Sequence, residues 1–182
     1  MTMPPVSRIT RPSTWFLWHG HRLGPGTRVL DLASGEGRHS LAAAARGARV
    51  TAVDRDQARL AAARERAEGQ GLSVDWIRAD LDTEPWLQLG SFDAVLVFNY
   101  LDRAQMPRIV GMIEPGGLLM METFLTAQRE LGWGPTSDGH LLRPGELARL
   151  VAPLTVVHGR EVIEAVDAER WRAVASVLAV NK

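Results

Sequence analysis

The feature that most constrains the fold is a glycine-rich turn between an apolar strand and an alanine-rich helix. The pattern predicts a strand over residues 28–32 and a helix over residues 38–46, with Gly35 and Gly37 between them. Two glycines one residue apart let a ligand approach the backbone closely, because no side chain blocks the outward-facing N–H groups. The turn therefore predicts a site for a nucleotide-like ligand, although glycines used only to change the chain direction give the same local pattern.

The rest of the chain alternates in the same way. Further strands are predicted over 49–53, 73–78, 92–98 and 118–124, and further helices over 56–68, 103–113 and 145–151. Several strands are apolar along their length, which is typical of a parallel sheet covered on both faces. Two final strands, 154–160 and 171–180, are predicted to form an antiparallel hairpin at one edge. The pattern predicts a doubly wound, Rossmann-like α/β fold with a mostly parallel sheet of about seven strands and helices on both faces.

Length and composition agree with one folding unit. The chain has 182 residues, 46% of them hydrophobic, so we expect a single domain over 1–182 whose residues 1–24 form an N-terminal extension with a possible lid helix. There are no cysteines, which excludes disulfides, thiolate metal sites and a cysteine nucleophile. We find neither a secretory apolar region nor a run of about 18 apolar residues, so a cytoplasmic protein that uses no membrane is expected.

The charge balance disfavours a polyanionic partner. Lys and Arg number 21 and Asp and Glu also 21, so the formal net charge is zero and no surplus positive field attracts nucleic acid. The histidines lie far apart, and no pair of histidines or carboxylates has the spacing of a known ligand set, so no metal is expected. We expect a small-molecule partner, while the oligomeric state stays open.

The chemistry of the turn favours one ligand over the commoner alternatives. A dinucleotide fingerprint has glycine or alanine where this chain has Ser40, and no Gly-Lys-Ser/Thr follows as in a P-loop. The turn is also longer than a pyrophosphate cradle needs, and Asp31 stands at its start. A carboxylate there suits a ligand with an ammonium group and a positive sulfonium better than a pyrophosphate. The predicted cofactor is therefore S-adenosylmethionine.

Two further acids follow predicted strands. Asp54 ends the second strand, 54 − 35 = 19 residues after Gly35 and next to Arg55, where its carboxylate can accept hydrogen bonds from both ribose hydroxyls. Asp80 follows the third strand, where its carboxylate can accept a hydrogen bond from the adenine amino group while Leu81 flanks the ring. A helix cap is the alternative role for Asp54, and a simple turn residue for Asp80. Because carboxyl ends of parallel strands converge on one crevice, their joint occurrence with Asp31 favours the cofactor roles.

These residues give the chain a family resemblance. It resembles the class I S-adenosylmethionine-dependent methyltransferases over nearly its whole length, with residues 31–37 as motif I. Within that family it is most similar to small stand-alone enzymes of the tellurite-resistance type, through residues 98–101, 122–124 and 141–147. The resemblance implies that motif I holds the methionine and ribose, that Asp54 and Asp80 bind ribose and adenine, and that Asn99 lies near the methionine end. The motif I residues in this role are Asp31, Ala33, Ser34, Gly35 and Gly37.

Methyl transfer is an in-line displacement at an activated sulfonium, so positioning of the acceptor is the main requirement and no catalytic base is assigned. The acceptor is expected over the ends of the fourth and fifth strands, under a lid from residues 13–21 or 126–140. The candidate acceptor-site residues are Trp15, Trp18, His39, Tyr100, Glu122, Trp133 and His140. The alternatives are core anchors for the two N-terminal tryptophans, a packed tyrosine, and surface or locally bonded histidines.

The sequence leaves competing functions open. The leading hypothesis is an enzyme that methylates a small molecule, and the alternative is a non-catalytic module that senses S-adenosylmethionine or S-adenosylhomocysteine. A nicotinamide-dependent reductase is disfavoured by Ser40 and the long turn. A DNA or RNA amine methylase is disfavoured because Asn99 is followed by Tyr100, Leu101 and Asp102 rather than by two prolines and an aromatic residue.

Overall fold

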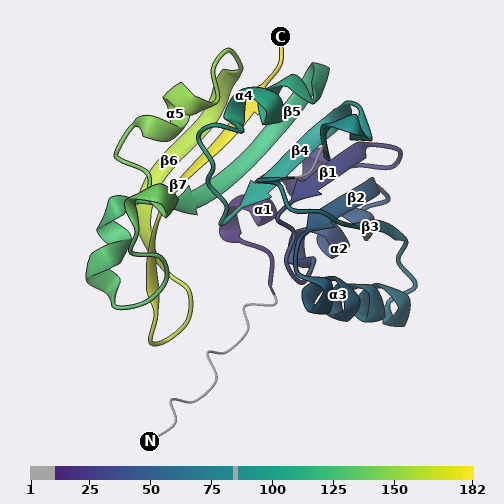
Figure 1. Cartoon of the computed structure of the whole chain (residues 1–182), viewed down its shortest axis with the longest axis horizontal. Helices are drawn as coiled ribbons and strands as arrows, with labels where there is room; N and C mark the ends of the chain where they lie inside the picture. Colours follow the sequence, from purple (N-terminus) through teal and green to yellow (C-terminus); the bar gives the residue numbers. More distant parts are fainter. Residues whose placement is uncertain (1–10, 84–85) are drawn as a thin grey trace, which may run out of the picture.

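A single sheet organises the molecule. The computed structural model describes residues 11–83 and 86–182, so residues 1–10 of the expected N-terminal extension lie outside the described residues. Seven described strands form the sheet in the order β3-β2-β1-β4-β5-β7-β6 (Figure 1). The strand order reverses beside β1, which is where doubly wound sheets bind their ligands.

The strands have the directions that the sequence predicts. The parallel strands are β1 (Arg28–Leu32), β2 (Arg49–Asp54), β3 (Val74–Arg78), β4 (Phe92–Phe98) and β5 (Ile113–Phe124). β7 (Trp171–Val180) pairs antiparallel with β5, and β6 (Thr155–Ala165) pairs antiparallel with β7. The predicted mostly parallel sheet of seven strands with an antiparallel C-terminal hairpin is therefore confirmed.

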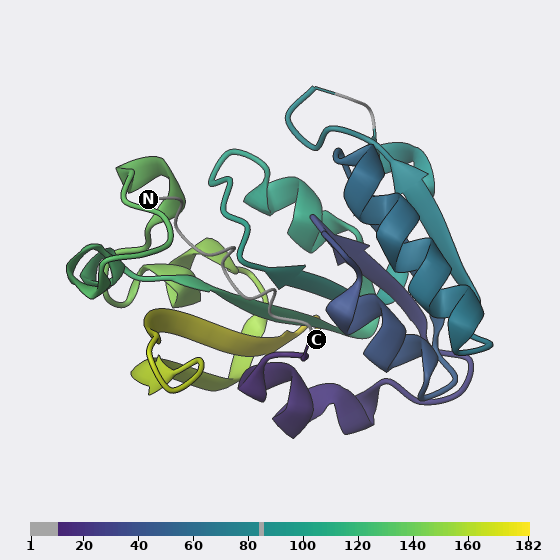
Figure 2. The same cartoon turned by 90° about the horizontal axis from the view of Figure 1, so that it is seen from below.

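Helices lie on both faces of the sheet, with α1 on one side and α4 on the other (Figure 2). The α-helices are α1 (Thr14–His19), α2 (Arg38–Ala44), α3 (Gln57–Gly69), α4 (Met106–Gly111) and α5 (Glu146–Leu150). Short 3₁₀ helices are η1 (Gly20–Arg22), η2 (Trp86–Leu89), η3 (Thr126–Leu131) and η4 (Asp138–His140). Within the described part of the chain, no helix has the length and apolar character needed to cross a membrane.

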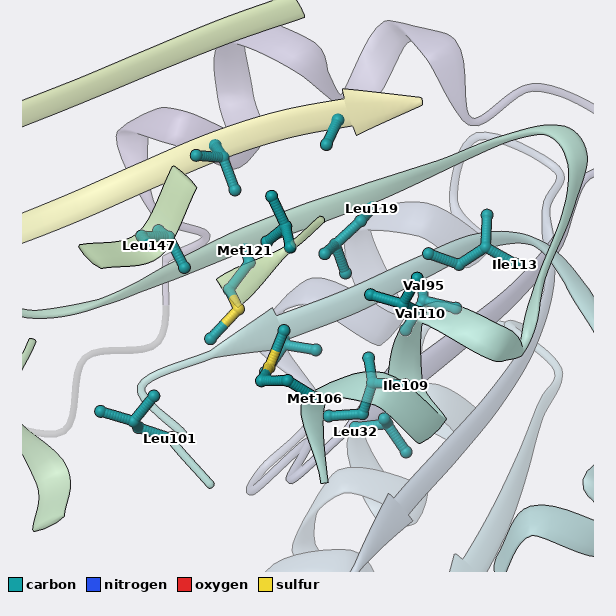
Figure 3. Packing of buried hydrophobic residues seen from close by; sticks show 14 of the residues in the cluster. Leu32, Val95, Leu101, Met106, Ile109, Val110, Ile113, Leu119, Met121 and Leu147 are labelled. Carbon is teal, nitrogen blue, oxygen red and sulfur yellow. The ribbon is translucent and has the colours of Figure 1, made fainter. Parts of the chain in front are cut away.

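The sheet separates two apolar clusters, and alternate residues of β1 belong to each. Val29 packs in the cluster of α1 and α2, which contains Phe16 and Ala43. Leu30 packs in the larger cluster, which contains Ile109 of α4. Figure 3 shows the larger cluster, where side chains from β4, β5 and α4 meet. Burial on both faces explains why the strands are apolar along their length rather than alternating.

Three elements have a boundary that differs from the prediction by three or more residues. β5 begins at Ile113 rather than 118, because Ile113 pairs with Phe92 before a register shift in β4, so the predicted helix over 103–113 is limited to Met106–Gly111. Pro107 stands in the first turn of α4, a position that tolerates proline. β6 continues to Ala165 rather than ending at 160, because it pairs with β7 along its whole length.

The glycine turn has a packing requirement in addition to its conformational one. Gly37 adopts a left-handed backbone with φ of 72°. A Cβ atom there would lie 2.5 Å from the ring of Trp76 on β3 and 3.2 Å from the Cβ of Ala63 on α3. Gly37 therefore lets α2 and α3 pack closely on the sheet, which is a role distinct from contact with a ligand.

We expect Gly37→Ala to lower the free energy of unfolding more than Gly71→Ala. Gly71 also has a left-handed backbone, with φ of 65°, but a Cβ atom there meets nothing within 4 Å. Backbone strain alone costs about 1–2 kcal/mol in each variant, and overpacking against Trp76 adds about 1–3 kcal/mol for Gly37. Urea denaturation measures both losses, and equal losses in the two variants would contradict the packing role.

Candidate functional site

A cavity of about 600 Å³ opens at the carboxyl ends of the parallel strands. Its volume lies within the range of small-molecule and cofactor sites. Nine of the ten residues predicted to bind the cofactor line it: Asp31, Ala33, Ser34, Gly35, Asp54, Arg55, Asp80, Leu81 and Asn99. The tenth, Gly37, does not line the cavity and instead packs against Trp76. Residues from the ends of β1, β2, β3 and β4 thus meet around one space.

Asp31 is the most deeply buried acid of the cavity wall, at 1% exposed. The hydroxyl of Ser40 donates a hydrogen bond to its Oδ2 atom at 2.5 Å and fixes the carboxyl group. Burial raises the pKa of Asp31 to about 7, while the hydrogen bond from Ser40 and the positive charge of Arg38 oppose the shift. A cationic group placed beside Asp31 would favour its ionised form.

Asp54 joins the end of β2 to the glycine turn after β1. Its Oδ2 atom accepts a hydrogen bond from the Gly35 N–H at 2.7 Å, and its Oδ1 atom accepts one from the Asp56 N–H at 2.9 Å. The cap of α3 is Asp56, whose side chain accepts from the N–H groups of Ala58 and Arg59. Asp54 is therefore not the cap of α3, and it lines the cavity.

Asp80 and Leu81 line the cavity beyond β3, beside Tyr100 from the segment after β4. The Tyr100 hydroxyl donates a hydrogen bond to Asp82 Oδ1 at 3.2 Å. Burial, and then the negative charge of Asp82, raises the pKa of Tyr100 above its usual value, so the phenol stays protonated. The tyrosine also packs against the larger apolar cluster, so it both lines the cavity and belongs to the packed interior.

Two residues other than glycine adopt a left-handed backbone conformation at the cavity. Ala33 follows β1 with φ of 53°, and Asn99 follows β4 with φ of 58°. This conformation is uncommon for an alanine and costs about 1–2 kcal/mol. Both residues line the cavity, and strained backbone is concentrated at functional sites.

A buried polar atom at the turn has no partner. The Oγ atom of Ser34 is buried without a hydrogen bond, although Ser34 lines the cavity. Buried hydroxyls are normally paired, so this atom marks a position for a polar ligand group. Together with the carboxylates of Asp31, Asp54 and Asp80, it provides the acceptors that the ammonium, ribose hydroxyls and adenine amine of S-adenosylmethionine require.

His39 lies on the α2 side of the cavity and is 3% exposed. Its ring stacks on Phe98 with centroids 3.8 Å apart, and its Nε2 atom accepts a hydrogen bond from the Ser13 N–H at 3.1 Å. Burial, followed by the positive charges of Arg38 and Arg172, lowers the pKa of His39 well below its usual value. The ring is neutral with its proton on Nδ1, so Nε2 is not free to act as a base.

Four of the seven candidate acceptor-site residues lie outside the cavity lining, whereas His39, Tyr100 and His140 line it. Trp15 is a core anchor, because it is 3% exposed and its Nε1 atom donates to the Val177 carbonyl at 3.1 Å. Trp18 on the same helix is 55% exposed and contacts Arg160. Neither tryptophan forms a wall of the cavity.

Glu122 and Trp133 are directed to the C-terminal hairpin instead. Glu122 is fully buried and forms ion pairs with Arg160 at 3.1 Å and Arg172 at 2.9 Å. The Trp133 Nε1 atom donates to the carbonyl of Trp171 at 2.6 Å. These three partners come from β6 and β7. The register of these strands cannot be derived from sequence spacing, so the sequence did not show that Glu122 and Trp133 are engaged there.

The segment 126–140 is anchored at both ends rather than free. Gln128 is fully buried, and its amide donates to the Trp133 carbonyl and accepts from the Ala173 N–H. Arg103 donates to the backbone carbonyls of residues 138, 139 and 141 and pairs with Glu146. These contacts hold η4, and with it His140, at the cavity.

Sequence reasoning missed several residues of the cavity. Arg38 and Phe98 line it, and Ser40 orients Asp31. Ser40 follows Asp31 by nine positions, which corresponds to the end of a strand, the turn and the first turn of a helix. This spacing could have predicted the contact between the two side chains. Among the described residues, no group of three or more His, Cys, Asp or Glu side chains is placed to hold a metal ion.

Comparisons with known proteins agree with this geometry. Residues 29–117 match the family described as a methyltransferase domain. A ubiquinone biosynthesis O-methyltransferase of Methylocella silvestris is 34% identical over 146 residues, which cover 70% of this chain and 57% of that relative. The chain therefore spans less than two thirds of that relative's length.

Solved structures share the fold at lower identity. TehB from Haemophilus influenzae has a TM-score of 0.70 with 20% identity, covering 86% of this chain and 58% of its own. A SAM-dependent methyltransferase from Methanosarcina mazei has a TM-score of 0.71 with 17% identity, covering 93% of this chain and 97% of its own.

The sheet order, the antiparallel final strand and the cavity beside β1 define the fold of class I methyltransferases. The chain carries a class I S-adenosylmethionine-dependent methyltransferase domain, and the cofactor of this class is S-adenosylmethionine. The predicted class and cofactor are confirmed. The binding roles of individual residues remain predictions.

We expect the affinity for S-adenosylhomocysteine to rise with pH through the titration of Asp31. An ammonium group binds the ionised carboxylate, and with a pKa of about 7 the ionised fraction grows roughly 15-fold between pH 5.5 and 7.0. Calorimetric titration at several pH values in this range measures the change. Asp31→Asn should bind more weakly at pH 7.0 and lose the pH dependence; a slope that persists in this variant would assign it to another group.

Proposed function

We propose that the chain transfers a methyl group from S-adenosylmethionine to a small-molecule acceptor. The observation that carries the proposal is the cavity in which Asp31, Asp54 and Asp80 line the ends of β1, β2 and β3 beside the unpartnered Ser34 Oγ atom. The Methylocella silvestris relative, an O-methyltransferase by name, supports a small acceptor. We also propose that residues 1–182 act as one domain.

The predicted cofactor contacts follow the order of the strands. Asp31 would bind the methionine ammonium group, with Ser34 and the backbone of Gly35 alongside it. Asp54 and Arg55 would lie at the ribose, and Asp80 and Leu81 at the adenine, while Asn99 would lie near the methionine end. This arrangement would direct the methyl group toward Asn99 and His140, which also line the cavity.

S-adenosylmethionine supplies a methyl group already activated on a sulfonium, so the chain's own residues mainly position the acceptor and exclude water. Phe98 would provide an apolar wall for an acceptor. The neutral His39 ring, held by Ser13 and Phe98, is a rigid part of the same wall. We therefore propose an in-line displacement that depends on orientation and uses no side-chain base.

A thermal-shift series tests the cofactor. S-adenosylmethionine and S-adenosylhomocysteine at millimolar concentration should raise the melting temperature, because they bind the native state, whereas NAD should not. Stabilisation by NAD alone would overturn the proposal. A screen of tellurite, thiols, phenols and amines for release of S-adenosylhomocysteine then tests turnover, and binding without turnover of any of them would favour the non-catalytic sensor.

We expect Asp54→Ala to weaken S-adenosylhomocysteine binding by about 1–3 kcal/mol, because ribose hydroxyls lose their acceptor. Asp75→Ala, which removes an exposed carboxylate from β3 outside the cavity lining, is the matched control and should leave binding unchanged. Calorimetry measures both affinities. An unchanged affinity in Asp54→Ala would mean that Asp54 serves only the backbone of the turn.

A further inference from the structure

Arg38 is a cation with an incomplete set of partners. It is the first residue of α2, and its side chain lines the cavity. Its Nη1 atom donates to the Arg11 carbonyl at 3.3 Å, but its Nη2 atom is buried and makes no hydrogen bond. Among residues 11–83 and 86–182, no carboxylate forms an ion pair with Arg38. A buried guanidinium nitrogen without an acceptor is costly, so an anion beside it is favoured.

The ion pairs beside Arg38 do not include it. Arg160 pairs with Glu122 at 3.1 Å and with Glu164 at 2.9 Å. Arg172 pairs with the same two glutamates. Two arginines therefore face two glutamates, and Arg38 forms an ion pair with neither glutamate. It interacts electrostatically with Glu122 and with Asp31, but neither carboxylate bonds to its Nη2 atom.

We infer that the methyl acceptor carries an anionic group, such as a carboxylate or an oxyanion, that binds to the guanidinium of Arg38. This inference rests on the proposed function and names the chemical class of its acceptor. Arg38 interacts electrostatically with Arg172 and Glu122, which belong to β7 and β5, and also with Asp31 at the end of β1. The predicted ribose and adenine contacts lie at β2 and β3, on the opposite side of β1. Arg38 is thus placed toward the acceptor side of the cavity.

The reach and chemistry of Arg38 fit this role. Arg38 lines the cavity, and a guanidinium presents its donors in a fixed fork that matches the geometry of a carboxylate. In the reaction, the acceptor nucleophile forms a bond to the methyl carbon while the carbon–sulfur bond breaks and its electron pair passes to sulfur, giving a neutral thioether. An anion held by Arg38 near the cationic sulfonium is attracted to it, and excluding water strengthens that attraction.

Calorimetric titration of the full chain tests the inference in two arms. The first arm titrates S-adenosylhomocysteine alone; the second titrates benzoate and inorganic phosphate into protein saturated with S-adenosylhomocysteine. Wild type should bind at least one of these anions, Arg38→Met should bind it at least tenfold more weakly, and Arg38→Lys should retain part of the affinity because it keeps the charge. Arg59→Met is the matched control, because Arg59 lines the same cavity but pairs with Asp56 at 3.4 Å.

Each outcome decides the question. Loss of anion binding in Arg38→Met, with S-adenosylhomocysteine affinity within twofold of wild type, supports the inference. A tenfold loss of S-adenosylhomocysteine affinity with anion binding unchanged assigns Arg38 to the methionine carboxylate and overturns it. Equal anion binding by wild type and Arg38→Met, or none by wild type, also overturns it while leaving the proposed function in place. If wild type does not bind S-adenosylhomocysteine, the proposed function fails and this inference fails with it.

Discussion

The rest of the structure depends on the position of β1 inside the sheet, beside the point where the strand order reverses. It is hydrogen bonded to β2 on one edge and to β4 on the other, and its residues from Val29 to Leu32 are buried. Because alternate side chains enter the two apolar clusters, one five-residue strand joins the layers on both sides of the sheet. The strand ends at Leu32, so the turn that follows begins from a strand that is paired on both edges.

Much of the fold and half of the site were predictable from the sequence. Parallel strands end at the same edge of a sheet, so the spacing of Asp31, Asp54 and Asp80 was enough to place them around one cavity. The acceptor side was not predictable in the same way. Glu122 is engaged by Arg160 and Arg172, and this pairing depends on the register of an antiparallel hairpin that lies far along the chain.

The cavity and the region around Glu122 are built from different interactions. At the cavity, short polar contacts connect neighbouring strand ends, as when Asp54 accepts from Gly35. Around Glu122, outside the cavity lining, buried ion pairs and aromatic rings connect distant segments, as when Arg160 contacts both Glu122 and Trp15. Local contacts follow from sequence spacing and long-range ones do not, which explains why the cofactor was easier to infer than the acceptor.

The contacts of Arg103 have a further consequence for how such a site diversifies. Its guanidinium holds the segment at 138–141 through main-chain carbonyls, which every amino acid provides. Leu141 is buried and Asp138 pairs with Arg129, but the exposed side chain of His140 at the cavity is free to change while the position of the backbone is kept. Position 140 is therefore suited to directed evolution, which would alter the cavity lining without rebuilding the strand ends around it.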